Sequence, residues 1–145
     1  KKNPSKEIGW YEVSTTEEGK HDRLLQFFST SQPIFQWHSD TFELPRDAVL
    51  LARSESCINQ AFRYGNNAYG FQFHLEVNAP LIERWLTVDA HQSELASVGG
   101  ESKAYQIREA TQRYIQQNEI LGRQTFSEFL ALTGSRTRKR ILKTR

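Results

Sequence analysis

The hydrophobic period of the chain changes at Pro80, and this change constrains the fold more than any other feature. Before Pro80, short apolar, aromatic and β-branched segments alternate with turn residues, which is the pattern of strands. The expected strands cover residues 7–13, 33–40, 48–54, 59–65 and 68–77. After Pro80, residues Leu81, Ile82, Trp85 and Leu86 recur at helical spacing. The sequence therefore predicts strands in the first part of the chain and helices in the second.

Helical spacing also appears at other places in the chain. Residues 19–28 are expected to form a short helix before the second strand, and Gly99-Gly100 ends the helical segment that follows Pro80. Two further helices are expected over residues 102–118 and 125–132. The second of these starts with Thr125-x-x-Glu128, which has the pattern of a capping box.

Two of the expected strands, 48–54 and 68–75, are apolar on both faces. Strands of this kind are typical of a layered α/β sheet that helices cover on both sides. Few helices are expected before residue 79 to cover such a sheet, and no strand–helix unit leads the chain. We therefore expect these 145 residues to be the later part of a larger α/β domain.

Charge and cysteine content limit the class of protein. The net charge is +2, but residues 134–145 carry six positive charges and no acid, so residues 1–133 carry a net charge of −4. The basic tail lacks interleaved aromatic residues, and we therefore do not expect it to bind nucleic acid. No run approaches the length of a membrane span, and a single cysteine, Cys57, fits a reducing compartment. We expect a cytoplasmic protein without membrane contact.

The stretch AYGFQFHLEV, residues 68–77, ends in a histidine and a glutamate two positions apart. On a strand, His74 and Glu76 would point to the same face, at the carboxyl end where ligands usually bind to an open α/β sheet. A carboxylate beside an imidazole fixes its tautomer and stabilises the imidazolium, which suits a general base. A buried structural histidine followed by an exposed glutamate would give the same spacing, so the pair alone leaves both interpretations open.

GFQFHLEV resembles the histidine–glutamate signature of class I glutamine amidotransferases, usually FQFHPE, with Leu75 in place of the proline. Similar segments stand upstream in the family's order: EIGWYEV (7–13), QWHSDTFELP (36–45) and AVLLARSESCINQAFRYG (48–65). Together they resemble the stand-alone bacterial amidotransferases related to the glutaminase domain of GMP synthase. The resemblance covers most of residues 3–86, and more loosely extends to about residue 133.

This resemblance implies an α/β fold: the three-layer, flavodoxin-like class I glutamine amidotransferase fold, incomplete at its N-terminal side and with a helical C-terminal end. Residues 1–90 would form the C-terminal part of the amidotransferase domain. Residues 91–133 would be a helical extension that packs on it, and residues 134–145 a disordered basic tail.

The resemblance also implies the chemistry. Family members hydrolyse the side-chain amide of glutamine to glutamate and ammonia through a Cys-His-Glu triad, in which His74 would be the base and Glu76 would orient it. Glutamine would be the substrate, a synthase domain or substrate would accept the ammonia, and no cofactor is implied. A γ-glutamyl peptide hydrolase and a non-catalytic regulatory or partner-binding module of the same fold are the alternatives.

The family's nucleophile is absent from these residues. It lies in a G-x-C-x-G elbow, upstream of the strand that resembles residues 7–13, so it would precede Lys1 and the chain alone would be inactive. Cys57 has no flanking glycines, and we interpret it as a small, partly buried residue.

A second candidate site follows the strand at 33–40. Relatives carry a similar element near the α-amino and α-carboxylate groups of glutamine, so the resemblance implies that His38 and Ser39 bind substrate. A side-chain turn that closes the strand would explain Ser39 equally well. The four histidines show no ligand spacing and the lone cysteine forms no C-x-x-C pair, so we expect no metal site.

Overall fold

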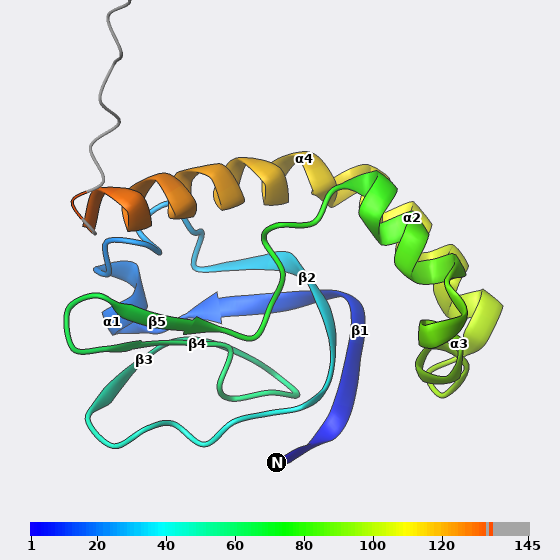
Figure 1. Ribbon diagram of the computed structural model, residues 1–145, viewed down its shortest axis with the longest axis horizontal. Helices are drawn as coiled ribbons and strands as arrows, with labels where there is room; N and C mark the ends of the chain where they lie inside the picture. Colours follow the sequence, from blue (N-terminus) through cyan, green and yellow to red (C-terminus); the bar gives the residue numbers. More distant parts are fainter. Residues whose placement is uncertain (133, 135–145) are drawn as a thin grey trace, which may run out of the picture.

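The computed structural model describes residues 1–132 and 134. Figure 1 shows a curled sheet with the long last helix along one side, the two helices before it at one end, and a short first helix at the opposite end. The basic tail predicted from residue 134 onward lies, apart from Gly134, outside the described residues. Among the described residues, no helix is both long and apolar enough to cross a membrane.

In the described part of the chain, the sheet has five strands in the order β2-β1-β3-β4-β5, and every pairing among them is antiparallel. The strands are β1 (Lys2–Thr15), β2 (Ser31–Asp40), β3 (Ala48–Ser54), β4 (Ala61–Tyr64) and β5 (Ala68–Phe71). All five expected strands are therefore confirmed, although β5 ends six residues before the predicted boundary at residue 77. Residues 72–77 follow β5 as irregular chain, except for an isolated antiparallel bridge between His74 and Phe35 of β2.

The helices are α1 (Glu17–Lys20), α2 (Ala79–Thr87), α3 (Asp89–Ala96) and α4 (Gly100–Leu132). The predicted helix over residues 19–28 is wrong, because a series of turns follows α1. In these turns the carboxylate of Asp22 accepts a hydrogen bond from the Leu24 N–H at 2.9 Å, and Leu24 and Leu25 become fully buried. Local side-chain bonding thus replaced the expected helical ladder.

The two helices predicted at 102–118 and 125–132 form one continuous helix, α4, of 33 residues. Thr125 lies inside this helix instead of capping it, and its hydroxyl donates to the Leu24 carbonyl at 3.4 Å. The capping-box prediction is therefore wrong. A single glycine between the two segments lowers helix propensity but does not end a helix that packs along its whole length.

Alternation along β1 and β2 places two cores on opposite faces of the sheet. On one face, Ile8 and Phe35 pack against α2, α3 and the first half of α4. On the other face, Val13 and Ile34 join Leu51 and Phe73 and the turns after α1. The described residues do not cover β5 on both faces, because its side chains are exposed or half-buried. The expectation of a doubly buried strand there is not met by this chain.

Gly19 fixes how closely α1 approaches the sheet. A Cβ atom at this buried position would overlap the carbonyl oxygen of Leu51 in β3. We predict that Gly19→Ala lowers the free energy of unfolding by about 1–3 kcal/mol, because backbone atoms would have to separate. Urea unfolding measures this change. Glu18→Ala, at an exposed position of the same helix, is the control, and equal stability of the two variants would contradict the close approach.

Candidate active site

His74 and Glu76 form a hydrogen-bonded pair directly after the last strand. The Nδ1 of His74 donates to Oε1 of Glu76 at 2.7 Å, which sets the tautomer that carries the proton on Nδ1. Within residues 1–132, Nε2 has no hydrogen-bond partner, so its lone pair is available to accept a proton. The side chains are 26% and 62% exposed, respectively, so the pair is open to solvent. The sequence correctly predicted that the two side chains lie together.

The backbone of His74 is held by the neighbouring strand. Its N–H donates to the carbonyl oxygen of Phe35 at 2.9 Å, which is the isolated bridge that follows β5. The imidazole packs edge-on against Trp85 of α2, with ring centroids 5.1 Å apart and an interplanar angle of 84°. Trp85 in turn contacts Trp37 and His91. This aromatic cluster closes one side of the imidazole.

The hydrogen bond from His74 also controls the charge of its partner. It is the largest influence on Glu76 and lowers the pKa of that carboxyl below its ordinary value of 4.5, although partial burial opposes the shift. Glu76 is therefore a carboxylate at neutral pH. A carboxylate in this place can stabilise a positive charge on His74 during proton transfer.

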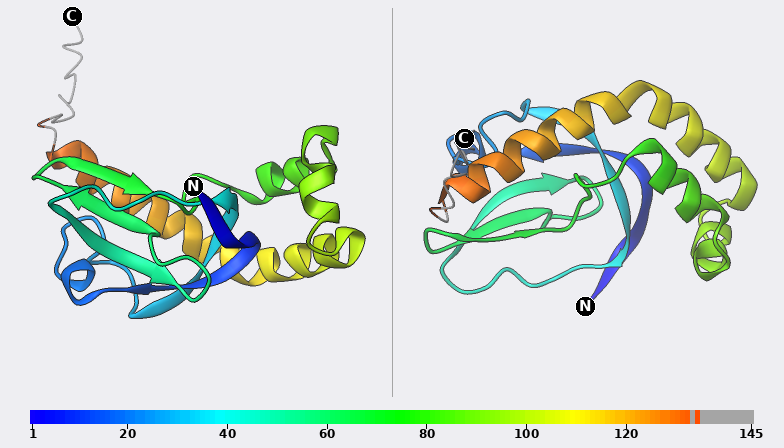
Figure 2. Two further views of the ribbon diagram at one scale, coloured as in Figure 1. Left: turned by 90° about the horizontal axis from the view of Figure 1, so that it is seen from below. Right: turned by 45° about the horizontal axis from the view of Figure 1, so that its top comes forward.

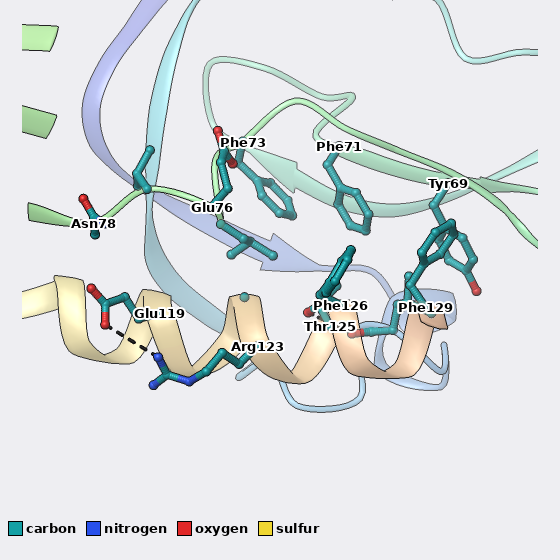
Figure 3. Close-up of a pocket in the computed structure, with 14 residues that line it drawn as sticks. Tyr69, Phe71, Phe73, Glu76, Asn78, Glu119, Arg123, Thr125, Phe126 and Phe129 are labelled. Atoms are coloured by element: carbon teal, nitrogen blue, oxygen red, sulfur yellow. Dashed lines mark hydrogen bonds and ion pairs between the residues drawn. The ribbon is translucent and has the colours of Figure 1, made fainter. Parts of the chain in front are cut away.

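A groove of about 710 Å³ lies beside Glu76. Figure 3 shows that aromatic side chains from β5 and the residues just after it face those from α4 across the groove. These side chains are Tyr69, Phe71, Phe73, Phe126 and Phe129. At the end of the groove near Glu76, α4 contributes Glu119 and Arg123, which form an ion pair at 3.7 Å. The groove is thus apolar along most of its length and charged next to the His–Glu pair.

The second predicted site is built differently. His38 is 8% exposed, and both of its ring nitrogens are engaged within the protein, Nε2 with Glu7 at 2.8 Å and Nδ1 with the Asp40 carbonyl at 3.0 Å. Ser39 is half-buried at the next position of β2. No hydrogen bond joins either residue to the His74–Glu76 pair in the described part of the chain. A substrate-binding role for His38 and Ser39 stays a prediction.

A buried carboxylate that the sequence analysis did not identify organises this region. Glu7 is completely buried, and each of its oxygens accepts two hydrogen bonds. Oε1 accepts from the hydroxyls of Ser54 and Ser56, both at 2.6 Å, and Oε2 accepts from Gln60 at 2.6 Å and His38 at 2.8 Å. Burial alone raises the pKa of Glu7, but the bonds from His38, Ser54 and Ser56 outweigh it and lower the pKa below 4.5.

Glu7 stands in the predicted strand 7–13 at an inward-facing position, which is an unusual place for an acid and the only sequence signal of this network. Glu7, His38 and Cys57 also offer potential metal ligands within 4.8 Å of one another. However, Glu7 already accepts four donors, and burial raises the pKa of the Cys57 thiol. A cation would have to break this network, so these residues do not fit a resident metal ion.

A histidine that is hydrogen-bonded to a carboxylate, placed after a strand and beside an open groove, is an arrangement that can transfer a proton. Comparisons with known proteins show which family has a similar sequence and fold. The chain is 36% identical over 122 residues to the glutamine amidotransferase-like protein YfeJ of Salmonella typhimurium. This match covers 83% of the chain and 50% of YfeJ. No protein-family profile matches the chain.

Solved structures give the same result. A glutamine amidotransferase from Thermotoga maritima superposes with a TM-score of 0.76 at 32% identity, over 89% of this chain and 53% of that one. A glutamine amidotransferase from Methylobacillus flagellatus superposes with a TM-score of 0.78 over 91% of this chain and 55% of that one. Its sequence identity is 22%, so it supports the fold alone. The chain is similar in sequence and fold to the class I glutamine amidotransferases, so the predicted fold class is confirmed. It spans about half the length of the relatives it matches.

The pairing of His74 with Glu76 is testable by titration. We predict that His74→Ala raises the pKa of Glu76 towards its ordinary value of 4.5, because the hydrogen bond that favours the carboxylate is removed. NMR of the Glu76 carboxyl carbon as a function of pH measures the midpoint. His91→Ala, which removes another imidazole of the aromatic cluster, should leave it unchanged. The same midpoint in wild type and His74→Ala would mean that the pair does not form in solution.

The network around Glu7 makes a separate prediction. We expect Glu7→Gln to lower the free energy of unfolding by about 3 kcal/mol at neutral pH, because a buried charged acceptor is lost and its donors remain. The folded pKa of Glu7 lies below 4.5, so its contribution is complete above that pH and is lost as the pH falls through the folded value. The difference between wild type and variant should therefore shrink in acid.

Urea unfolding at a series of pH values measures this difference. Glu12→Gln is the matched control, since it makes the same substitution at an exposed position of the same strand. A pH-independent difference between wild type and Glu7→Gln would contradict the assignment of a buried, ionised Glu7.

Proposed function

We propose that the protein is a glutaminase of the amidotransferase type, which hydrolyses the side-chain amide of glutamine to glutamate and ammonia. The single observation that carries this proposal is the hydrogen bond between His74 and Glu76, on a chain similar to glutamine amidotransferases. The ammonia would pass to a synthase domain or to an acceptor substrate. The single free cysteine is in keeping with a cytoplasmic location.

In the proposed reaction, Nε2 of His74 takes the proton of a cysteine thiol, and the thiolate attacks the amide carbon of glutamine. His74 then returns the proton to the leaving nitrogen, ammonia departs, and a glutamyl thioester remains. Water attacks the thioester while His74 removes its proton, the bond between the acyl carbon and sulfur breaks, and His74 returns the proton to the sulfur, so that glutamate is released and the thiol is regenerated. Glu76 holds the imidazole in the correct tautomer and stabilises its positive charge in each step.

Cys57 does not suit the role of this nucleophile. Its side chain is fully buried, its thiol contacts Thr41 and the Asn59 carbonyl, and burial raises its pKa. A nucleophilic cysteine needs the opposite, an exposed thiol with a lowered pKa. We therefore propose that the nucleophile belongs to a part of the protein outside these 145 residues, and that the chain alone is inactive.

Ammonia release from glutamine tests both parts of the proposal. We expect release by a longer protein that includes the sequence encoded upstream of Lys1, and none by the 145-residue chain. In the longer protein, Glu76→Gln should lower kcat by about 100-fold, because the base loses its orienting carboxylate. Glu12→Gln makes the same substitution at an exposed position of β1, outside this groove, and should retain activity.

The outcomes separate the alternatives. Equal activity of the two proteins would refute a nucleophile outside the chain. Full activity of Glu76→Gln would refute the triad assignment. Complete inactivity of the longer protein towards glutamine and γ-glutamyl amides would favour a non-catalytic, partner-binding module of the same fold.

A further inference from the structure

Helix α4 runs across one side of the molecule, from the end near α2 and α3 to the turns that follow α1, as Figure 2 shows. In its first half, Thr111 accepts a hydrogen bond from the indole of Trp10 at 3.0 Å. Near its end, Glu128 pairs with Arg23 at 2.7 Å. Between these two contacts, α4 lies against the backbone of the segment that carries His74 and Glu76. The middle of α4 is therefore placed to act on the candidate site.

Asn118 makes the first contact with that segment. It is 1% exposed, and its Nδ2 donates to the carbonyl oxygen of His74 at 3.2 Å. Its Oδ1 has no hydrogen-bond partner among the described residues. A leucine of similar size would avoid the cost of this unpaired acceptor. Asparagine therefore contributes here through its side-chain N–H donor, which binds the backbone carbonyl of His74.

Gly122 makes the second contact, one turn further along the same face of α4. A Cβ atom at this position would overlap the carbonyl oxygen of Leu75. The backbone of Gly122 is helical, so alanine would otherwise be favoured there. The absence of a side chain allows the helix to approach the backbone between His74 and Glu76.

Together these contacts fix the backbone on both sides of the base. The N–H of His74 is bound by Phe35 of β2, and its carbonyl is bound by Asn118 of α4. Leu75 stands where the resembling family carries proline, and leucine leaves the φ angle free where proline would fix it. The close approach of α4 to the carbonyl oxygen of Leu75 limits the movement of this segment from outside.

We propose that Asn118 and Gly122 are positioning residues that hold His74 and Glu76 in the geometry needed for proton transfer. This role rests on the proposed function, because it concerns the same pair of residues. Neither residue touches the reacting atoms. Their effect comes from the backbone they restrain, and a displacement of about 1 Å at a catalytic group can reduce turnover by about 100-fold.

Gly122→Ala in the 145-residue chain tests the geometry without any need for activity. Added volume at Gly122 should move the backbone of Leu75 and weaken the hydrogen bond between His74 and Glu76. We expect the NMR signals of residues 74–76 to shift, and the titration midpoint of Glu76 to rise towards that of the His74→Ala variant. Gln117→Ala, at an exposed position of α4, is the matched control and should leave both unchanged.

A folded Gly122→Ala chain with unchanged signals and an unchanged midpoint would overturn the proposal. Asn118→Leu is the second variant, because it keeps the buried volume and removes the donor to His74. It should speed hydrogen exchange in residues 74–76 and shift the same midpoint, even if Gly122→Ala prevents folding. Wild-type behaviour of Asn118→Leu would equally overturn the proposal.

Activity of the longer protein separates this proposal from the proposed function. We expect both variants to lower kcat by about 10- to 100-fold with little change in KM, and Gln117→Ala to match the wild type. If the wild-type longer protein is inactive, the glutaminase proposal fails, and the NMR measurements still decide whether α4 holds the pair. If the midpoint of Glu76 shifts while kcat stays unchanged, the positioning role in catalysis is refuted.

Discussion

The hydrogen bond between the His74 N–H and the Phe35 carbonyl is the contact on which the arrangement of the molecule depends. β2 and β5 stand at opposite ends of the strand order, so they would be far apart in a flat sheet. The bridge between Phe35 and His74 requires the sheet to curl until the chain after β5 reaches β2. This curl brings the candidate base, the aromatic cluster of α2 and the middle of α4 into one place.

Two kinds of packing support the curled sheet. On one face, apolar and aromatic side chains from β1 and β2 meet the helices, and Trp85, which contacts Trp37, packs against the side of His74. On the other face, Glu7 gathers hydroxyl, amide and imidazole donors from several separate segments of the chain. An ionised carboxylate in the interior is tolerable only with such complete bonding. The polar network therefore specifies the register of β1 with β2 more sharply than apolar contacts would.

Most features that depend on residues close together in sequence were predictable, and features that depend on partners far away in sequence were not. The strands, the helical second part and the proximity of His74 to Glu76 depend on local period and spacing, and they were predictable. The helix expected over 19–28 failed because Asp22 bonds to the backbone two residues on. The break expected before Thr125 failed because that residue packs on Leu24, 101 positions away. Asn118 and Gly122 were not recognised for the same reason, since their partners lie far away in sequence.

The contact between Asn118 and His74 also bears on the order in which the protein is made. The two residues are 44 positions apart, so a nascent chain that has only just exposed His74 from the ribosome lacks the helix that holds it. Synthesis proceeds from the N-terminus at about 5–20 residues per second, which separates the two events by a few seconds. During that interval His74 and Glu76 are already outside the ribosome without the contact from α4. The site would therefore be among the last parts of the fold to become ordered during translation.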